Sequence, residues 1–208
     1  MSLNFLFLIL STFYDSFSKQ ISLLTVARDN SITPITTITT SFFCSSICPI
    51  DKDTFLVGTV RHSRPVRTVT VQGQEGNVQH GSLPNKSLSL GDSWCTFVQH
   101  KKTVVIADSS AHKVHLKSLG ESGWTTTVHH DLIREPQGVC GGGDRGSVFV
   151  CAKRAIVQLS SRGDVVASHN VGFIRPSTIS VSKDGRKLMV ANARRNKVNT
   201  IKLYRVEY

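Results

Sequence analysis

The stretch TVVIADSSAHKVHLKSL, residues 103–119, contains two apolar runs separated by a polar break. A similar stretch, KLMVANARRNKVNTIKL, begins at Lys187. Each has an apolar run, then Ala-Asp or Ala-Asn, then four polar or small residues and Lys-Val. Short apolar runs that are bounded by turn-forming residues are typical of β-strands. The pattern therefore predicts a pair of strands that recurs along the chain.

Further copies give the repeat a regular spacing. The segments FYDSFSKQISLL from Phe13, TFLVGTVRHSRPVRTV from Thr54 and SVFVCAKRAIVQL from Ser147 match the same pattern more loosely. The residues just before the polar break lie 44, 49, 44 and 40 positions apart and are Tyr14, Gly58, Ala107, Cys151 and Ala191. A short apolar segment precedes most copies, and another follows. A unit of four short strands that repeats every 40 to 50 residues is typical of a β-propeller blade.

The apolar pattern also fits stacked blades. The run Val148–Cys151 is apolar at every position, whereas a half-exposed strand alternates apolar and polar residues. Such a strand is expected to be covered on both faces, as in blades that stack around an axis. No amphipathic helix of 12 residues or more is evident in the sequence. We therefore predict a single all-β domain, a β-propeller of four-stranded antiparallel blades, over residues 1–208.

The charge of the chain is strongly positive and unevenly distributed. The formal net charge is +11 in 208 residues, of which 39% are hydrophobic and 19% charged. Twelve Lys and Arg residues but only two acidic ones, Asp164 and Asp184, lie between Lys153 and Arg205. A region of this kind attracts nucleic acid, an anionic membrane or an acidic protein surface, although a basic surface without a partner is an equal alternative.

The cysteines and the N-terminal residues indicate in which cellular compartment the protein is expected. The five cysteines are too few and too scattered for a disulfide framework, and no zinc-type spacing is present. The apolar run in MSLNFLFLIL is too short to span a bilayer and has no preceding Lys or Arg. A buried strand is favoured there over a cleaved signal peptide. A cytoplasmic protein with no membrane span, no metal and no cofactor is the expectation, and its oligomeric state is left open.

The repeat resembles the NHL-repeat propeller found at the C-terminus of many tripartite-motif proteins. The matching residues are Pro136–Val139, Lys183–Gly185, Ala107-Asp108 with His112–Val114, and Ala191-Asn192 with Asn196–Val198. The resemblance runs from about Phe13 onward. It weakens at Gly58-Thr59, and the fourth copy has Ala152 where the family has Asp.

The resemblance implies a ring of six blades, but about 45 residues per blade gives this chain four to five. We expect an incomplete or irregularly closed ring, with blades near residues 1–43 (partial), 44–90, 91–136, 137–176 and 177–208 (partial). The zinc modules that give tripartite-motif proteins ubiquitin-ligase activity are not in this sequence, so that activity is not carried over.

A basic residue recurs in the loop after the second strand of each repeat. Equivalent loops of a propeller emerge on one face, so these residues are expected to form a positive arc. They are Lys19, Arg61, His62, Arg64, His112, Lys113, Lys153, Arg154, Arg194, Arg195 and Lys197. Such an arc is able to pair with successive phosphates or with carboxylates. Some family members bind single-stranded RNA on a basic face. The sequence predicts a non-catalytic scaffold that binds a protein partner or single-stranded RNA.

Two catalytic alternatives rest on the same loops. Asp108, Ser109 and His112 are the residue types of a hydrolase triad, but the chain has no Gly-x-Ser-x-Gly elbow and other copies lack the trio. We therefore expect a loop without catalytic function. A calcium-dependent propeller hydrolase, of lactonase or esterase type, is the runner-up, with Asp15, Asp108 and Asn192 as equivalent ligand candidates.

Overall fold

The structure, a computed structural model, describes residues 5–7, 18–27, 29, 31–60, 62–78, 93–119, 125–142, 146–172, 175–182, 184–192 and 200–206. These residues form eighteen β-strands and one 3₁₀ turn, which confirms the all-β prediction. The strands belong to five antiparallel sheets, three with four strands and two with three. No helix among the described residues is long and apolar enough to cross a membrane.

The strands follow one another in order within each sheet. The first sheet has β1 (Phe5–Phe7), β2 (Gln20–Val26) and β3 (Ile32–Thr39), and the second has β4 (Cys44–Pro49), β5 (Thr54–Thr59), β6 (Val66–Thr70) and β7 (Glu75–Gly76). The third has β8 (Ser93–Val98), β9 (Thr103–Asp108), β10 (Lys113–Ser118) and β11 (Thr125–Val128), with η1 (Gln99–Lys101) between β8 and β9. The fourth has β12 (Val139–Gly142), β13 (Ser147–Cys151), β14 (Ala155–Leu159) and β15 (Val165–Asn170), and the fifth has β16 (Thr178–Val181), β17 (Lys187–Asn192) and β18 (Thr200–Arg205).

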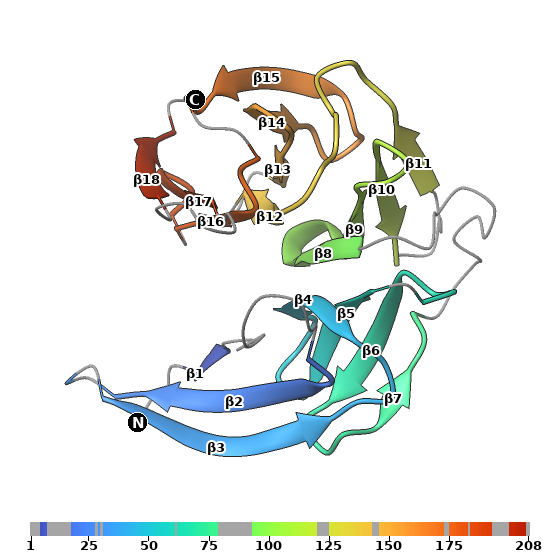
Figure 1. The fold of residues 1–208 in the computed structure, drawn as a ribbon, viewed down its shortest axis with the longest axis vertical. Coiled ribbons are helices and arrows are strands. Elements are labelled where there is room, and N and C mark those ends of the chain that lie inside the picture. The colour runs from blue at the N-terminus through green and yellow to red at the C-terminus, as the bar shows by residue number, and fades with distance from the viewer. Residues whose placement is uncertain are drawn as a thin grey trace.

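The second to fifth sheets meet along their first strands. Strand β4 contacts β8, β8 contacts β12, and β12 contacts β16. Figure 1 shows the later strands of each sheet fanning outward from these first strands, with the first and fifth sheets drawn apart on the same side of the view. Successive four-stranded sheets that radiate from their first strands are the blades of a β-propeller, as the repeat predicted.

The core consists of apolar layers between consecutive sheets. Four clusters of buried residues each join one sheet to the next. Strand β13 contributes to two of them, because Val148 and Val150 face the third sheet while Phe149 and Cys151 face the fifth. All four side chains are buried. The uninterrupted apolar run in this strand is therefore explained by cover on both faces.

The stretch Thr103–Leu119 forms the hairpin that its sequence predicted. Strand β9 ends at Asp108, four residues turn the chain, and β10 begins at Lys113 opposite Asp108. The buried Asp108 carboxylate accepts a hydrogen bond from the backbone N–H of Ala111 at 2.9 Å. His112, at the end of the turn, has a φ of 55°, the left-handed conformation that short turns require. Asp108 is thus the residue that shapes this turn.

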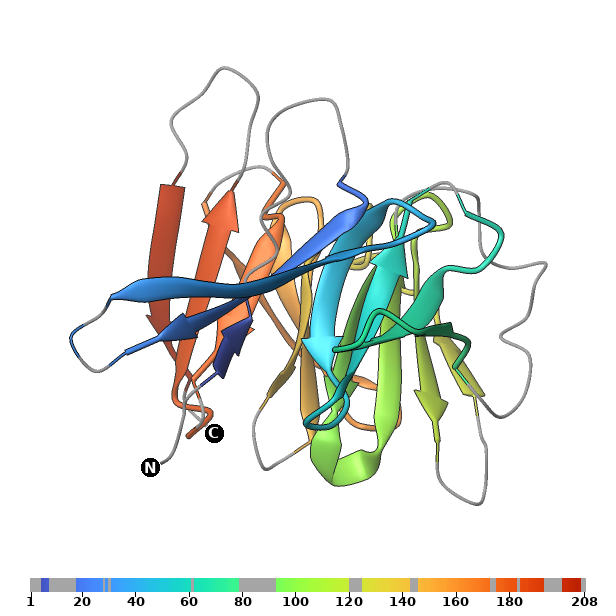
Figure 2. The same cartoon turned by 90° about the horizontal axis from the view of Figure 1, so that it is seen from below.

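The two ends of the sheets carry different connections. At one end lie the loops from second to third strands and the connections between sheets, which we call the loop face. At the other end, the turn face, lie the first-to-second and third-to-fourth hairpins, including η1. Figure 2 shows the strands running between these two ends, with the green turn of η1 at the lower one. In the first sheet β2 and β3 pack against β5 and β6 through Ile21, Leu23 and Ile38, as third and fourth strands do elsewhere. The segment before β2 therefore lies at the loop face, where the carbonyl of Lys19 accepts the N–H of Thr40 from the connection between β3 and β4.

Most of the cysteines pack as free thiols in or beside the core. All five are free, and Cys44, Cys95 and Cys151 are buried. Burial raises the pKa of Cys140 to about 12, so its thiol stays protonated at neutral pH. At the N-terminus, Phe5–Phe7 pairs with β2 as an antiparallel strand. The rest of the predicted N-terminal strand lies outside the described residues.

Candidate partner-binding face

The predicted basic residues that the structure describes all lie at the loop face. They come from four consecutive sheets and are Lys19, His62, Arg64, His112, Lys113, Lys153 and Arg154. Lys19, Arg64, His112 and Arg154 are exposed, and the other three are half-buried. The remaining predicted residues, Arg61, Arg194, Arg195 and Lys197, lie outside the described residues.

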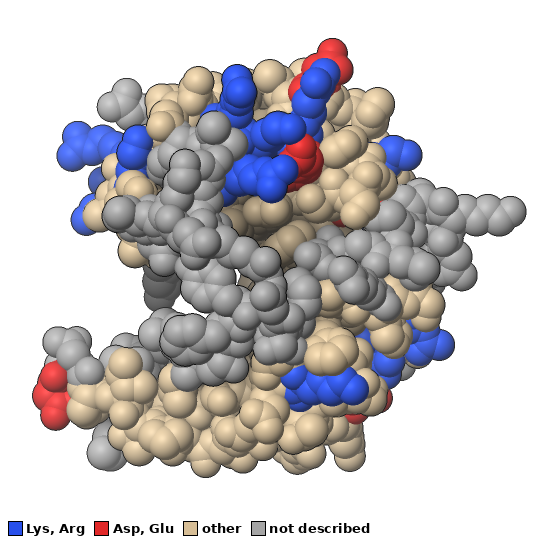
Figure 3. All heavy atoms as spheres, viewed as in Figure 1, with Lys and Arg blue, Asp and Glu red and all other residues tan. Residues whose placement is uncertain are grey.

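The positive charge on this face is interrupted by acidic groups. In Figure 3, Lys and Arg side chains gather in the upper half of the view around a small acidic group, and smaller basic groups lie in the lower half. Among the described residues, the predicted arc therefore consists of basic patches, one of which includes an acidic side chain.

Glu135 joins three sheets at the loop face. Its Oε1 accepts a hydrogen bond from Lys153 Nζ at 2.6 Å, and its Oε2 lies 3.1 Å from the guanidinium of Arg175. Its backbone N–H donates to Nδ1 of His112 at 2.9 Å. His112 belongs to the third sheet, Lys153 to the fourth, and Arg175 to the connection before the fifth. Through its carboxylate and its backbone N–H, Glu135 thus fixes the relative positions of three loops.

The electrostatics of this cluster favour an ionised Glu135. The hydrogen bond from Lys153 and the charge of Arg175 hold the pKa of the carboxyl below its usual value. The side chains of Lys153 and Arg175 remain 44% and 57% exposed, so both cations keep a surface for a partner. Glu135 offsets part of their charge while fixing their positions.

The backbone around this cluster is held in an uncommon conformation. His112, Glu135 and Arg175 have φ values of 55°, 48° and 60°, in the left-handed region that residues with a Cβ seldom adopt. The surrounding contacts maintain it, since Arg175 donates its N–H to the carbonyl of Lys153 at 2.7 Å. Non-glycine residues in this region concentrate at functional sites as well as at structural junctions.

The first two sheets form a second basic patch. The ammonium of Lys19 lies 4.9 Å from the ring centroid of Phe43, within cation–π range, and Phe43 is 45% exposed. The N–H of Arg64 donates to Nδ1 of His62 at 3.1 Å, which orders that loop. The guanidinium of Arg64 also hydrogen-bonds to the side-chain oxygen of Asn77. This patch combines positive charge with one exposed aromatic ring.

Sequence reasoning missed Glu135 and Arg175. Both precede a proline, Pro136 or Pro176, and the two prolines lie 40 residues apart like the repeat itself. The signal was therefore available in the equivalent pre-proline positions of the connections between sheets. Those connections lie outside the loops between second and third strands, where the basic residue recurs in each repeat.

The structure shows the surroundings of three of the catalytic and calcium-ligand candidates. His112 receives the N–H of Glu135 on Nδ1, and Asp108 caps its own turn. Asn192 is buried, and its side-chain oxygen has no hydrogen-bond partner among the described residues. Asp15 lies outside the described residues. Within the described part of the chain, no group of three or more His, Cys, Asp or Glu side chains is arranged to hold a metal ion.

Comparison with known proteins finds similar structures but no similar sequence. No family model and no curated protein sequence matches the chain. A protein of unknown function from Desulfotomaculum acetoxidans superimposes with a TM-score of 0.57 at 13% identity, over 92% of this chain and 63% of its own. Virginiamycin B lyase from Staphylococcus aureus gives 0.57 at 13% identity, over 91% and 67%. A chain of the nidogen/laminin complex gives 0.65 at 11% identity, over 85% and 68%.

These similarities concern the fold. The chain spans about 63% of the length of the Desulfotomaculum protein. The lyase and the nidogen/laminin chain are propeller proteins. This chain is a β-propeller. The low identities carry no activity and no partner from those proteins to this one.

Proposed function

We propose that the loop face binds an acidic segment of a protein partner, and that this propeller serves as a non-catalytic scaffold. The observation that carries the proposal is the recurrence of basic side chains at the same end of four consecutive sheets. Positive patches attract acidic segments and raise their rate of association. Glu135 supports this function because it fixes Lys153 and Arg175 in defined positions, which lowers the entropy cost of binding.

A protein partner is favoured over single-stranded RNA by the character of the surface. Single-stranded nucleic acid is bound by basic grooves together with several aromatic rings on which bases stack. Among the described residues of the loop face, Phe43 is the one large aromatic ring that is clearly exposed. Lys19 covers that ring at 4.9 Å, which leaves less of its surface for stacking. RNA binding is therefore an alternative outcome of the test.

Fluorescence anisotropy with a labelled decaglutamate peptide tests the proposal. The loop-face variant carries Lys19→Glu, Arg64→Glu and Arg154→Glu. The matched control carries Lys52→Glu, Lys101→Glu and Lys102→Glu, the same charge change at the turn face. We expect the loop-face variant to lose roughly tenfold or more in affinity and the control to change by about twofold, with binding weaker at higher salt.

Other outcomes have defined meanings. Equal losses in both variants would show that net charge alone attracts the peptide and would refute a specific face. Tighter binding of a labelled twelve-nucleotide single-stranded RNA, lost in the loop-face variant, would assign the face to RNA instead.

Within the propeller class, an NHL-type repeat is our proposal for its family, and a cytoplasmic location is our proposal for its compartment. The Pro-x-Gly segment at Pro136 and the Lys-Asp-Gly turn at Lys183 support the first. The five free cysteines support the second, because reducing compartments keep thiols unpaired. The runner-up, a calcium-dependent hydrolase, requires calcium to raise the melting temperature and to support ester hydrolysis.

A further inference from the structure

The fifth sheet leaves the position of a fourth strand unfilled by the described residues. In the second, third and fourth sheets, β7, β11 and β15 pair with the third strand. Strand β18 is third in its sheet, and among the described residues it pairs with β17 alone. Figures 1 and 2 both place β18 at an outer margin of the molecule. A strand edge of this kind is a template for pairing with another chain.

The hydrogen-bond register shows which backbone groups face the free edge. The N–H of Val206 donates to the carbonyl of Arg186 at 2.9 Å, so these two residues form a hydrogen-bonded pair. Bonded and non-bonded pairs alternate along antiparallel strands. The N–H and C=O groups that point away from β17 therefore belong to Ile201, Leu203 and Arg205.

The neighbouring fourth sheet is uncovered at the same place. In the third sheet, the outer strand β11 is covered by the turn between β14 and β15, where a Cβ on Gly163 would lie 2.8 Å from Val128. In the fourth sheet, residues 166–170 of β15 are all exposed. Among the described residues, none takes the place of a fourth strand and its turn along β15 and β18.

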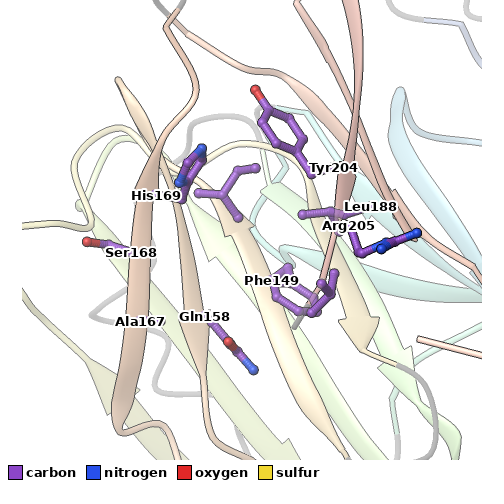
Figure 4. A pocket seen from close by; sticks show the side chains of 10 residues that line it. Phe149, Gln158, Ala167, Ser168, His169, Leu188, Tyr204 and Arg205 are labelled. Atoms are coloured by element: carbon purple, nitrogen blue, oxygen red, sulfur yellow. The ribbon is translucent and has the colours of Figure 1, made fainter. Parts of the chain in front are cut away.

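A cavity of about 300 Å³ lies between these two sheets. Its apolar lining includes Phe149, Ile156 and Leu188, and His169 and Tyr204 approach each other with ring centroids 5.4 Å apart. Figure 4 shows these side chains around the cavity, with Arg205 pointing away from it. The cavity is large enough for one apolar side chain of a strand lying against β18.

The charged side chains that the structure describes around this edge are mostly basic. Lys187 and Arg205 are exposed on the fifth sheet, and Arg186 lies beside them. The nearby Asp184 is held in its own turn by Ser182 Oγ and the N–H of Arg186. A second copy of this chain would bring another +11 of charge to this edge, whereas an acidic strand would be attracted.

We propose that β18 accepts an extended acidic segment of a partner protein as the fourth strand of its sheet, with one apolar side chain of that segment in the cavity beside Tyr204. Main-chain bonds to Ile201, Leu203 and Arg205 supply affinity, and the cavity and basic rim supply selectivity. This site is separate from the loop face and does not depend on it.

The test uses a fluorescein-labelled peptide of sequence Glu-Val-Glu-Leu-Glu-Val-Glu and the full chain. Leu203→Pro removes an N–H that faces the free edge while leaving the pairing with β17 intact, since proline is tolerated at such edge positions. Leu203→Ala, which keeps that N–H, is the matched control. We expect Leu203→Pro to weaken binding by about tenfold and Leu203→Ala to change it by less than about threefold. Circular dichroism checks that both variants fold.

A second arm separates strand pairing from simple charge attraction. The same peptide with alternate backbone N-methyl groups keeps its charge but loses donors along one edge, so it should bind at least about tenfold more weakly. The proposal is overturned if the methylated peptide binds equally, if Leu203→Pro has no effect, or if the peptide does not bind. It is also overturned if ultracentrifugation shows a dimer that Leu203→Pro dissociates. The loop-face variant should bind this peptide like the unmodified chain, so the two proposals fail independently.

Discussion

At the scale of single residues, charged side chains at the loop face have two effects. The cations attract an acidic partner, and their ion pairs with Glu135 hold the loops in place. Glu135 accepts contacts from Lys153 and Arg175 and donates its N–H to His112. Had these cations no acidic partner, their loops would be ordered less and would repel one another. Because Glu135 contacts loops of three consecutive sheets, it couples the arrangement of the loop face to the stacking of the blades.

The substitution Glu135→Gln tests how much these contacts of Glu135 stabilise the fold. We expect the free energy of unfolding at pH 7 to fall by about 1 kcal/mol, because a charge-assisted hydrogen bond and an ion pair on a partly exposed carboxylate are lost. Urea denaturation measures it. Asp131→Asn is the control, because Asp131 is 98% exposed and lies 3.9 Å from Arg134. An equal effect of both substitutions would contradict the role of Glu135.

The same pair of proteins gives a pH prediction. The folded-state pKa of Glu135 is lowered, so its contribution is fully present above its unfolded value of 4.5 and is lost as the pH falls through the folded value. The stability difference between the unmodified chain and Glu135→Gln should therefore be constant from pH 8 to 6 and shrink below pH 4.5. A difference that persists undiminished at low pH would point to a steric effect of the substitution.

His115 gives a second pH dependence, of a different origin. Its ring is buried, Nδ1 lies 3.0 Å from Thr127 Oγ1, and Nε2 has no hydrogen-bond partner in the part of the chain that the structure describes. Burial lowers its pKa from 6.5, although the nearby Asp108 acts in the opposite sense. The unfolded state then binds more protons below pH 6.5, so His115 costs stability as the pH falls, by at most about 1.4 kcal/mol per pH unit.

Replacing His115 by Gln should flatten the stability profile between pH 7 and 5. The comparison is of urea midpoints at several pH values, with His129→Gln as the control because His129 is exposed. Parallel profiles for the unmodified chain and His115→Gln would show that His115 does not titrate differently on folding.

At the scale of elements, the sequence predicted the strands whose environment is local or repeated. The hairpin of β9 and β10 follows from two apolar runs and Asp108, and the continuous apolar run of β13 follows from cover on both faces. The register of the sheets against one another depends on contacts between distant segments. The close approach of Gly138 to Ser177, across two sheets, is one that no local pattern could reveal.

Gly138→Ala tests the closeness of the fourth and fifth sheets. A Cβ at Gly138 would lie 2.5 Å from the carbonyl oxygen of Ser177, which also accepts the N–H of Gly138 at 3.0 Å. Because backbone must move, we expect a loss of about 2 kcal/mol of stability. Gly141→Ala is the control, since its nearest neighbour, Val98 Cγ2, would be 3.4 Å away. Thermal unfolding of both variants measures the difference, and equal melting temperatures would contradict the packing described.

At the scale of the whole molecule, the repeat predicted the propeller and which loops share a face. Eleven basic residues were assigned from their place in the repeat, and the seven that the structure describes all lie at one end of the sheets. The sequence could not predict how their charge is distributed, because Glu135 reaches Lys153 and Arg175 from the connections between sheets. The cavity beside β18 was equally hidden, since it is formed by side chains of two different sheets.

The central claim is that an acidic partner binds the loop face, and chemical crosslinking tests it most directly. A carbodiimide couples glutamate carboxylates of a bound decaglutamate peptide to nearby lysine amines, and mass spectrometry identifies the lysines. Binding at the loop face predicts crosslinks at Lys19, Lys113 and Lys153, suppressed by salt. Crosslinks concentrated at Lys52, Lys101 and Lys102, on the turn face, would contradict the claim.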